Sequence, residues 1–419
     1  MPAVTVVARV ARIKLQAAVQ KAPLGAWSAG SRRQGGVAGA TTTPPPSLTS
    51  STLSPRFTHD VELAPYTTLE LGGRARHFCR VRDEAGLREA VEYGRARGWP
   101  LLVLGGGSNL VIADAGFDGL VLEIGLRGRG LERDSEAAGV ALLTAAAGES
   151  WDGLVAYSVQ QRLAGLECLS GIPGRVGAAP IQNIGAYGQQ LSDSLESLRV
   201  LDCDALEVRE MAAAECELGY RHSRFKREPG RHVVLAARFA LRPEGAPSVR
   251  YAELQRWLDA QAPAGSGRPE LASVRRAVLA LRRAKSMLAE PGDENRRSAG
   301  SFFLNPVVAE AEAERLCEAM LASGLIERAD AMPRFAAESG KVKLAAAWLI
   351  ERAGFTKGEH RGAVGISSAH ALSLVHHGGG SSAELLSLAR EIRDRVRERF
   401  GIALRPEPVF VGFGDDFEF

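Results

Sequence analysis

The sequence has few cysteines and no pattern that would connect them. Its 419 residues include five cysteines, and no two of them form a C-x-x-C pair. An odd number of scattered cysteines does not indicate a disulfide framework, and it favours the reducing environment of a cytoplasm. His376 and His377 are adjacent, but no Cys, Asp or Glu stands near them at the spacing of metal ligands, so no metal site is expected.

Long apolar runs are also missing. No uninterrupted run reaches the length of about 20 residues that a membrane-spanning helix needs, so membrane insertion is not expected. The chain has no G-x-x-x-x-G-K-[ST] phosphate loop either. With 45% hydrophobic and 24% charged residues, the composition is that of a globular protein long enough for two to three domains.

Acidic residues are absent from the first 59 positions, which carry seven Lys or Arg. Because the whole chain has 52 basic and 49 acidic side chains, residues 60–419 hold 45 basic against 49 acidic ones. A mildly acidic body does not indicate a nucleic-acid partner.

Residues 1–56 are rich in Ala, Ser, Thr and Gly and show no sustained apolar periodicity. This composition predicts a disordered N-terminal extension. It is also typical of an organelle targeting segment. Three interpretations of residues 1–56 therefore remain open: an inert tail, a start codon placed too early, and a functional targeting signal.

Apolar periodicity predicts alternating strands and helices from about Phe57 onward. Strands are expected at residues 77–81, 101–104, 119–124, 139–147, 197–202, 232–241 and 409–411. Helices are expected from Asp83 to Gly98 and at residues 150–162, 343–353 and 381–400. The last helix has a capping box of Ser381 and Glu384 and a stop at Gly401. The region after about residue 270 is predicted to be mostly helical.

Glycine is concentrated in three runs, at positions 105–107, 171–177 and 185–188. The first run follows a predicted strand and continues into Ser108 and Asn109, but it is no G-x-G-x-x-G fingerprint because position 110 is Leu. Each run alone is as well explained by a tight turn. Together they indicate backbone N–H groups that approach the anionic part of a dinucleotide.

Three side chains are candidates for chemistry. Arg221 can grip a carboxylate with two parallel hydrogen bonds, although a surface arginine is the commoner alternative. Ser301 precedes two phenylalanines and is either poised in a dry site or a plain cap or turn residue. Glu407, fixed between two prolines, can carry a proton or be an exposed acid of the tail. Arg282, Arg283 and Lys285 either contact phosphate or belong to the solvated face of a helix.

Several strings occur in a fixed order along the chain: Leu104-Gly-Gly-Gly-Ser-Asn109, Ile172-Pro-Gly-Arg-Val-Gly177, Pro180-Ile-Gln-Asn-Ile-Gly-Ala-Tyr-Gly188, Gly219-Tyr-Arg221, Ala299-Gly-Ser-Phe-Phe303 with Asn305-Pro306, and Pro406-Glu407. Their order and their amino-acid sequences resemble those of the UDP-N-acetylenolpyruvoylglucosamine reductase family over about residues 60–412. Residues 1–56 have no counterpart in that family.

The resemblance implies an α+β fold with a two-part FAD-binding domain of the vanillyl-alcohol-oxidase type and a C-terminal α+β substrate-binding domain. The FAD-binding subdomains are expected at residues 57–124 and 125–290, the substrate-binding domain at 291–402, and a tail returning to the active site at 403–419. The implied activity is the FAD-dependent, NADPH-using reduction of UDP-N-acetyl-enolpyruvylglucosamine to UDP-N-acetylmuramate, a cytoplasmic step of peptidoglycan precursor synthesis.

The resemblance also assigns roles to residues. Arg221 and Glu407 match residues that stabilise the enolate formed by hydride addition, and Ser301 matches the residue that protonates the adjacent carbon. Tyr251, Lys285 and Asn305 match substrate-binding positions. The FAD contacts implied are Gly105, Gly106, Gly107, Ser108, Asn109, Ile172, Pro173, Gly174, Gly177, Gln182, Asn183, Gly185, Ala186 and Tyr187.

Two other functions remain open. One is a different flavin oxidoreductase of the same fold; these often tether the flavin through a His near the first glycine loop, and residues 101–120 contain none, which favours non-covalent FAD. The other is a catalytically silent nucleotide-sugar-binding protein, against which the presence of Arg221, Ser301 and Glu407 argues. A monomer is slightly favoured.

Overall fold

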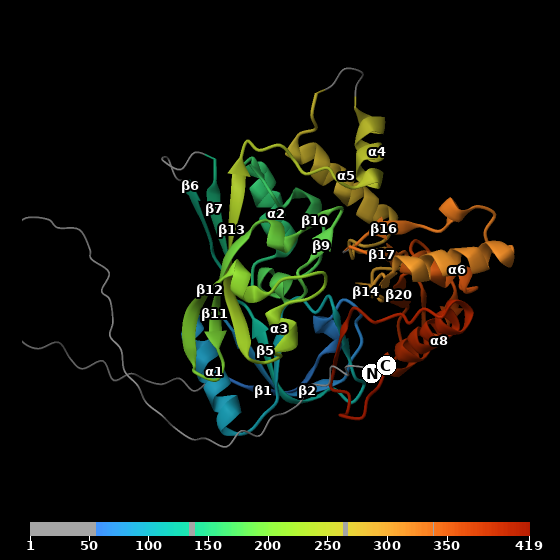
Figure 1. Cartoon of the computed structure of the whole chain (residues 1–419). Coiled ribbons are helices and arrows are strands. Elements are labelled where there is room, and N and C mark those ends of the chain that lie inside the picture. Colours follow the sequence, from blue (N-terminus) through green and yellow to red (C-terminus); the bar gives the residue numbers. More distant parts are fainter. Residues whose placement is uncertain (1–55, 134–138, 263–266, 338) are drawn as a thin grey trace, which may run out of the picture. The chain divides into compact units, whose positions relative to one another are not determined.

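The computed structural model describes residues 56–133, 139–262, 267–337 and 339–419. All but the last residue of the predicted N-terminal extension therefore lies outside the described residues. In the described part, strands and helices first alternate along the chain and then gather in a C-terminal part of shorter strands and longer helices (Figure 1). None of the described helices combines the length and the apolar character needed to cross a membrane.

The first sheet is the α/β unit that the sequence predicts. Its strand order is β1 (Thr58–Glu62), β2 (Arg74–Val81), β5 (Phe117–Ile124) and β3 (Leu101–Leu104). The last three strands are parallel, and α1 (Glu84–Ala96) leads from β2 toward β3. Asp83 begins α1 as predicted, because its carboxylate accepts a hydrogen bond from the N–H of Gly86.

The second sheet is antiparallel. Its order is β12 (Glu207–Ala212), β11 (Leu195–Asp202), β13 (His232–Pro243), β7 (Ala141–Ala146) and β6 (Arg129–Arg133), with β8 (Leu163–Ala164) paired to the end of β13. The predicted strands at 139–147, 197–202 and 232–241 are confirmed. β12 was not predicted, because only Met211 of its six residues is fully buried and the strand lacks an apolar alternation.

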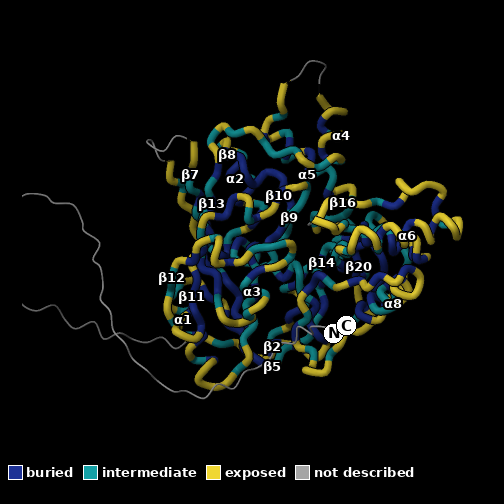
Figure 2. Tube along the Cα trace, in the orientation of Figure 1, coloured by how far each residue is buried: buried dark blue, intermediate teal, exposed yellow. Residues whose placement is uncertain are grey.

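Both sheets share one hydrophobic core. Side chains of α1 and β5, among them Leu87 and Leu122, pack in the same cluster as Trp151 of α2 (Trp151–Gln160) and Phe239 of β13. The buried residues form a continuous interior in Figure 2. Helices α4 (Ala252–Gln261) and α5 (Leu271–Ala284) pack against each other through a small cluster that includes Cys168.

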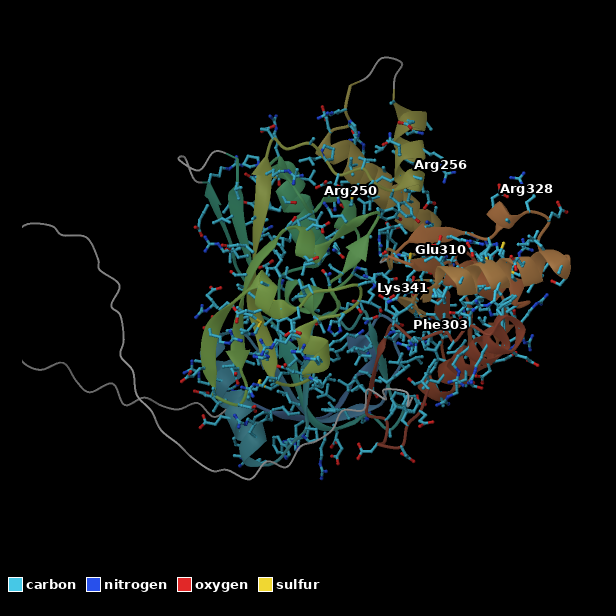
Figure 3. All side chains as sticks on the ribbon, in the orientation of Figure 1. Arg250, Arg256, Phe303, Glu310, Arg328 and Lys341 are labelled. Atoms are coloured by element: carbon cyan, nitrogen blue, oxygen red, sulfur yellow. The ribbon has the colours of Figure 1, made fainter. Side chains whose placement is uncertain are left out.

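The C-terminal part contains two further sheets and a second large core. One sheet has the order β14 (Ser298–Ser301), β20 (Ser373–His376), β19 (Val364–Ile366) and β18 (His360–Arg361); the other has the order β15 (Val307–Ala309), β17 (Lys341–Leu344) and β16 (Arg334–Ala336). Helices α6 (Glu310–Ala322), α7 (Ala346–Arg352) and α8 (Ser382–Phe400) cover them. Phe303, labelled in Figure 3, is buried in this second core.

The prediction of a mostly helical region after residue 270 is wrong. Strands β14 to β20 have two to four residues, which is too short to display a period, and none of them was predicted; α6 was not predicted either. The predicted helix at 343–353 also begins too early, because Lys343 lies in β17 and α7 starts at Ala346. The last helix is as predicted: Ser381 and Glu384 form its capping box, and Gly401 ends it with φ 70°.

Short elements bring distant segments together. β4 (Leu110–Ile112), which follows the first glycine run, pairs in parallel with β21 (Val409–Val411) near the end of the chain. β9 (Gly185–Ala186) and β10 (Gln189–Gln190) form a small hairpin within the third glycine run and its continuation. α3 (Arg224–Arg227) is a single turn just after Arg221.

Candidate active site

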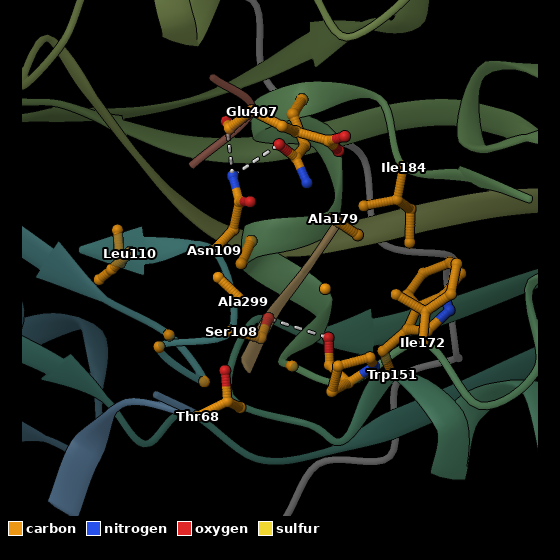
Figure 4. A pocket seen from close by; sticks show the side chains of 18 of the residues that line it. Thr68, Ser108, Asn109, Leu110, Trp151, Ile172, Ala179, Ile184, Ala299 and Glu407 are labelled. Atoms are coloured by element: carbon orange, nitrogen blue, oxygen red, sulfur yellow. Dashed lines mark hydrogen bonds between the residues drawn. The ribbon is translucent and has the colours of Figure 1, made fainter. Parts of the chain in front are cut away.

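A single cavity is lined by all three glycine runs and by the three candidates for chemistry. Its walls include residues 105–109, 172–175 and 184–185, and also Arg221, Ser301 and Glu407. Figure 4 shows part of this lining, with Ser108, Ile172 and Glu407 among the labelled residues. These segments are far apart in the sequence, so the cavity exists only because the sheets and the C-terminal part close around it. The resemblance implies that Arg221 and Glu407 act on the same enolate, and the structure brings their side chains together.

The first glycine loop is locked to the second. A side chain on Gly106 would place its Cβ 2.6 Å from the Cα of Gly174, and Gly107 adopts φ 62°. The hydroxyl of Ser108 donates to the carbonyl of Pro173 across 3.1 Å. Glycine at position 106 is therefore required by the approach of two protein backbones as well as by any ligand.

Asn109 ties the glycine loop to the chain end. Its amide donates to Gln182 Oε1 at 2.7 Å and to the carbonyl of Glu407 at 3.3 Å (Figure 4). The backbone carbonyl of Asn109 accepts a hydrogen bond from the backbone N–H of Val409, in register with the pairing of β4 and β21. The tail that carries Glu407 is thus held directly beside the first glycine run.

The same tail also runs beside the Ala-Gly-Ser-Phe-Phe string. Phe303 forms a β-bridge with Pro406, and the N–H of Glu407 donates to the carbonyl of Phe302. Ser301 ends β14, one residue before this pairing, and its side chain lines the cavity. Two strings separated by about 100 residues in the sequence are placed together by these backbone contacts.

Arg221 stands in a tight two-residue turn. The N–H of Gly219 donates to the carbonyl of His222 and the N–H of His222 donates back, while Arg221 itself has φ 53°. Its guanidinium donates to the carbonyl of Gly185 at 3.3 Å, and its Nε lies 2.8 Å from Oε1 of Glu407. The turn thus points a cation at the one carboxylate that the tail brings into the cavity.

Glu407 is under two opposing influences. Its side chain is 10% exposed, and this burial raises the pKa of the carboxyl group, whereas the neighbouring cations of Arg221 and Lys226 lower it. The ion pair with Arg221 would favour the ionised form, but burial is the larger influence. The arrangement therefore favours a Glu407 that holds its proton to a higher pH than an ordinary glutamate does.

The cavity suits an anionic dinucleotide. Arg282 lines it and is almost completely buried; among the described residues its Nε has no hydrogen-bond partner. A buried cation with a free donor is costly unless an anion meets it. The solvated helix face considered for Arg282 from the sequence is therefore wrong. No His, Cys or Tyr is among the described lining residues, so the wall offers no usual tether for a covalent flavin.

Not all the expected FAD contacts face the cavity. Gly177 packs against Ala147, and a Cβ there would lie 2.5 Å from the Cβ of Ala147. Asn183 is 2% exposed, and its amide donates to the carbonyl of Gly219 at 3.1 Å, so it supports the turn of Arg221. Ala186 and Tyr187 also lie outside the lining. Their contact with a cofactor stays a prediction.

The three expected substrate-binding residues lie outside the cavity as well. Lys285 is paired with Glu253, with Nζ 2.7 Å from Oε2. The ring of Tyr251 packs edge-on against Tyr187 at 5.6 Å, and Oδ1 of Asn305 accepts from the N–H of Ala346 at the start of α7. Their role toward a substrate also stays a prediction.

Three cations that line the site, Lys226, Arg175 and Arg296, were not singled out from the sequence. Lys226 lines the cavity together with Arg221 and Glu407. The signal was present, since Lys226 follows Arg221 by five residues within the same basic segment. A lysine among several basic residues reads as solvated surface until the fold shows which one is turned inward.

Comparisons with known proteins agree with this arrangement. The family described as FAD binding domain matches residues 75–209, and the family described as UDP-N-acetylenolpyruvoylglucosamine reductase, C-terminal domain, matches residues 291–411. A UDP-N-acetylenolpyruvoylglucosamine reductase of Saccharopolyspora erythraea is 50% identical over 354 residues, which cover 83% of this chain and 94% of that protein. The one of Streptomyces coelicolor is 44% identical over 369 residues, covering 87% and 93%.

A solved structure is similar over nearly its whole length. The UDP-N-acetylenolpyruvylglucosamine reductase from Thermus caldophilus has a TM-score of 0.55 and 25% identity, and the match covers 85% of this chain and 99% of that one. The α+β fold with an FAD-binding domain, expected from the sequence, is confirmed.

Proposed function

The chain belongs to the UDP-N-acetylenolpyruvoylglucosamine reductase family, and we propose that its Arg221, Ser301 and Glu407 promote the reduction of the enolpyruvyl group of UDP-N-acetyl-enolpyruvylglucosamine. The reaction is an FAD-dependent step of peptidoglycan precursor synthesis, with NADPH as the electron donor and UDP-N-acetylmuramate as the product. The glycine runs and Arg282 would hold FAD in the cavity, and the bound flavin would supply hydride transfer from NADPH to the terminal vinyl carbon of the substrate. All five cysteines are free and buried, which supports a cytoplasmic location.

The residues of the cavity suit the charge changes of this reaction. Hydride addition to the vinyl carbon moves negative charge onto the carboxylate side of the substrate as an enolate. Arg221 supplies a planar cation for that carboxylate, and a protonated Glu407 supplies a hydrogen-bond donor. Both are in place before the charge develops, which is the condition for electrostatic stabilisation of a transition state.

Ser301 completes the addition by protonating the carbon next to the reduced one. Its hydroxyl lines the same cavity, at the end of β14 and beside the strand pairing that positions Glu407. A positioned acid of this kind typically accelerates a reaction by about 10²–10⁴-fold.

The observation that carries the proposal is the meeting of Arg221, Ser301 and Glu407 in one cavity with the glycine loops. A silent nucleotide-sugar-binding protein would not need an arginine and a carboxyl group 2.8 Å apart in a buried site. A flavin oxidase with a tethered cofactor would need a His, Cys or Tyr side chain on the wall, and none is found among the described lining residues.

The test is an absorbance spectrum of the purified holoenzyme. NADPH should bleach the flavin band, and UDP-N-acetyl-enolpyruvylglucosamine should restore it without oxygen. Acid precipitation should release the flavin into the supernatant, because we propose that it is held non-covalently. Flavin that stays with the pellet, or a reduced flavin that the enolpyruvyl substrate leaves unchanged, would contradict the proposal.

We also propose the division into domains. The FAD-binding subdomains would span residues 57–124 and 125–290, the substrate-binding domain 291–402, and the tail 403–419. The second large core, whose members come mostly from residues 299–404, supports the boundary near residue 290. Limited proteolysis should cut near residue 290 before it cuts near residue 124.

A further inference from the structure

Lys226 occupies an unusual place for a lysine. It lies on the single turn α3, whose first residue is preceded by Ser223; the Ser223 hydroxyl accepts from the N–H of Lys226 and donates to the carbonyl of Ile181. These contacts hold α3 against Ile181, which precedes the third glycine run. Lys226 lines the cavity. Its neighbour Arg227 instead pairs with Glu217 and Glu228 at the surface.

The ammonium of Lys226 reaches back to the turn that carries Arg221. Its Nζ donates to the carbonyl of Arg221 at 3.4 Å. The other end of the turn is held by Asn183, whose amide donates to the carbonyl of Gly219. Arg221 has a left-handed backbone, which a side chain with a Cβ adopts only when its surroundings hold it there. Among the described residues, Lys226 and Asn183 each donate a side-chain hydrogen bond to a carbonyl of this turn.

A hydrogen bond of 3.4 Å is too long to be the whole reason for burying a lysine. Burial lowers the pKa of Lys226, and the carboxylate of Glu407 is the neighbour that acts against this. Within the described residues Lys226 forms no ion pair with a carboxylate. The charge of Lys226 is therefore not fully neutralised. It gives the part of the cavity beside Arg221 and Glu407 an excess of positive charge.

The charge count of the reaction matches that excess. The substrate carboxylate carries one negative charge, and hydride addition makes the enolate a dianion. Five cations from the described part of the chain line the cavity, and the two of them that act on Glu407, Arg221 and Lys226, supply two positive charges, whereas a protonated Glu407 supplies none. We infer that Lys226 is a positioning residue for this reduction, because its ammonium fixes the turn of Arg221 and adds the second positive charge that faces Glu407. The inference rests on the proposed function and deepens it.

Several groups face Glu407 and enter any interpretation of pH dependence. Arg221 and Lys226 lower the pKa of its carboxyl group, whereas burial and, to a smaller extent, Glu407 raise the pKa of Tyr220, the residue before Arg221. Burial and then the cation of Arg221 lower the pKa of Lys343 of β17, whose Nζ lies 4.7 Å from the centre of the Tyr220 ring. Lys226 is the group to replace in an experiment, because it is not one of the proposed catalytic groups. Its replacement also leaves the contact between Lys343 and Tyr220 in place.

The test compares three variants of the FAD-loaded protein by stopped-flow measurement of both half-reactions. Lys226→Met should leave flavin reduction by NADPH nearly unchanged and slow reoxidation by UDP-N-acetyl-enolpyruvylglucosamine by about 10–100-fold. Lys226→Arg keeps the charge and should recover most of that loss. Arg227→Met removes the same charge from the same helix, but on the solvent side, and should behave as wild type.

The pH profile of reoxidation separates positioning from a purely structural role. Removing the cation of Lys226 takes away one influence that lowers the pKa of Glu407, so the alkaline limb should move to higher pH in Lys226→Met and stay in place in Lys226→Arg. Because normal reduction by NADPH reports a folded, FAD-loaded variant, a misfolded protein cannot imitate this result.

Two results would overturn the inference. One is a Lys226→Met protein that reoxidises at the wild-type rate with an unmoved limb. The other is a slow Lys226→Met protein whose limb does not move and whose loss Lys226→Arg fails to recover. A wild-type protein that NADPH reduces but the enolpyruvyl substrate does not reoxidise would instead refute the proposed function, and the inference with it.

Discussion

At the scale of single residues, the pH dependence of the protein's stability reports whether the carboxyl group of Glu407 is protonated in the folded protein. Burial raises the pKa of its carboxyl group above the value of about 4.3 found in unfolded chains. Between these two pKa values the folded protein binds more protons than the unfolded one, so the contribution of Glu407 to stability is present at low pH and is lost as the pH rises. Glutamine carries no such dependence.

The melting temperature of Glu407→Gln should therefore rise relative to wild type as the pH is raised from about 4 to 8. Parallel thermal unfolding of both proteins over that range measures the difference. A difference that falls with pH would mean that the ion pair with Arg221 outweighs burial and that Glu407 is ionised. Such a result would also remove the neutral donor from the proposed mechanism.

Ser301 provides a second test at this scale. Ser301→Ala should keep flavin reduction by NADPH and slow reoxidation by the enolpyruvyl substrate by about 10²–10⁴-fold, because only the second half-reaction needs a proton on carbon. Ser373→Ala is the matched control, since Ser373 is the cross-strand partner of Ser301 on β20. Equal losses in both half-reactions, or equal losses in the two variants, would show that Ser301 is structural.

At the scale of elements, the interlock of the two glycine loops is the feature to test. Gly106→Ala would bring a Cβ within 2.6 Å of the Cα of Gly174, so one loop must shift. Overpacking of this kind typically costs about 1–3 kcal/mol of stability. Because the shift moves the loop that lines the cofactor cavity, FAD should also be released more readily.

The measurement is the melting temperature together with the free flavin separated by ultrafiltration. Gly130→Ala in β6 is the control, since a Cβ at Gly130 meets nothing within 4 Å. If both variants retain FAD and stability equally, the two loops have room to move apart and the interlock is not essential.

Elements differed in how well the sequence predicted them. α8 carries a capping box, an apolar stripe and a glycine stop in 19 residues, and each signal points to the same helix. The strands of the C-terminal part have two to four residues and depend on partners far along the chain, as β14 depends on β20. Nothing local distinguishes such strands from loops.

At the scale of the whole molecule, the N-terminal segment is expected to be dispensable. Deleting residues 1–56 should leave turnover and the melting temperature unchanged, because the segment has no apolar periodicity with which to bury surface against the rest. Steady-state assays and thermal unfolding of the shortened and full-length proteins provide the measurement. A clear fall in either quantity would show that the segment contributes to the folded enzyme.

The sequence by itself determined the glycine runs, the strong helices, the parallel unit around α1, and the three side chains with suitable chemistry. These are local patterns, because each depends on only a few residues that are neighbours in the sequence. The ordered strings also sufficed to indicate the family, which the relatives confirm.

Only the tertiary structure decided which of these residues meet. Glu407 reaches Arg221 because β21 pairs with β4 and residues 405–407 pair with 302–304. Arg282 and Lys226 changed from ordinary basic residues to cations of the cavity, because the same charge is solvated or desolvated according to what the fold places around it. Burial and long-range backbone pairing are properties of the whole chain, and no local pattern encodes them.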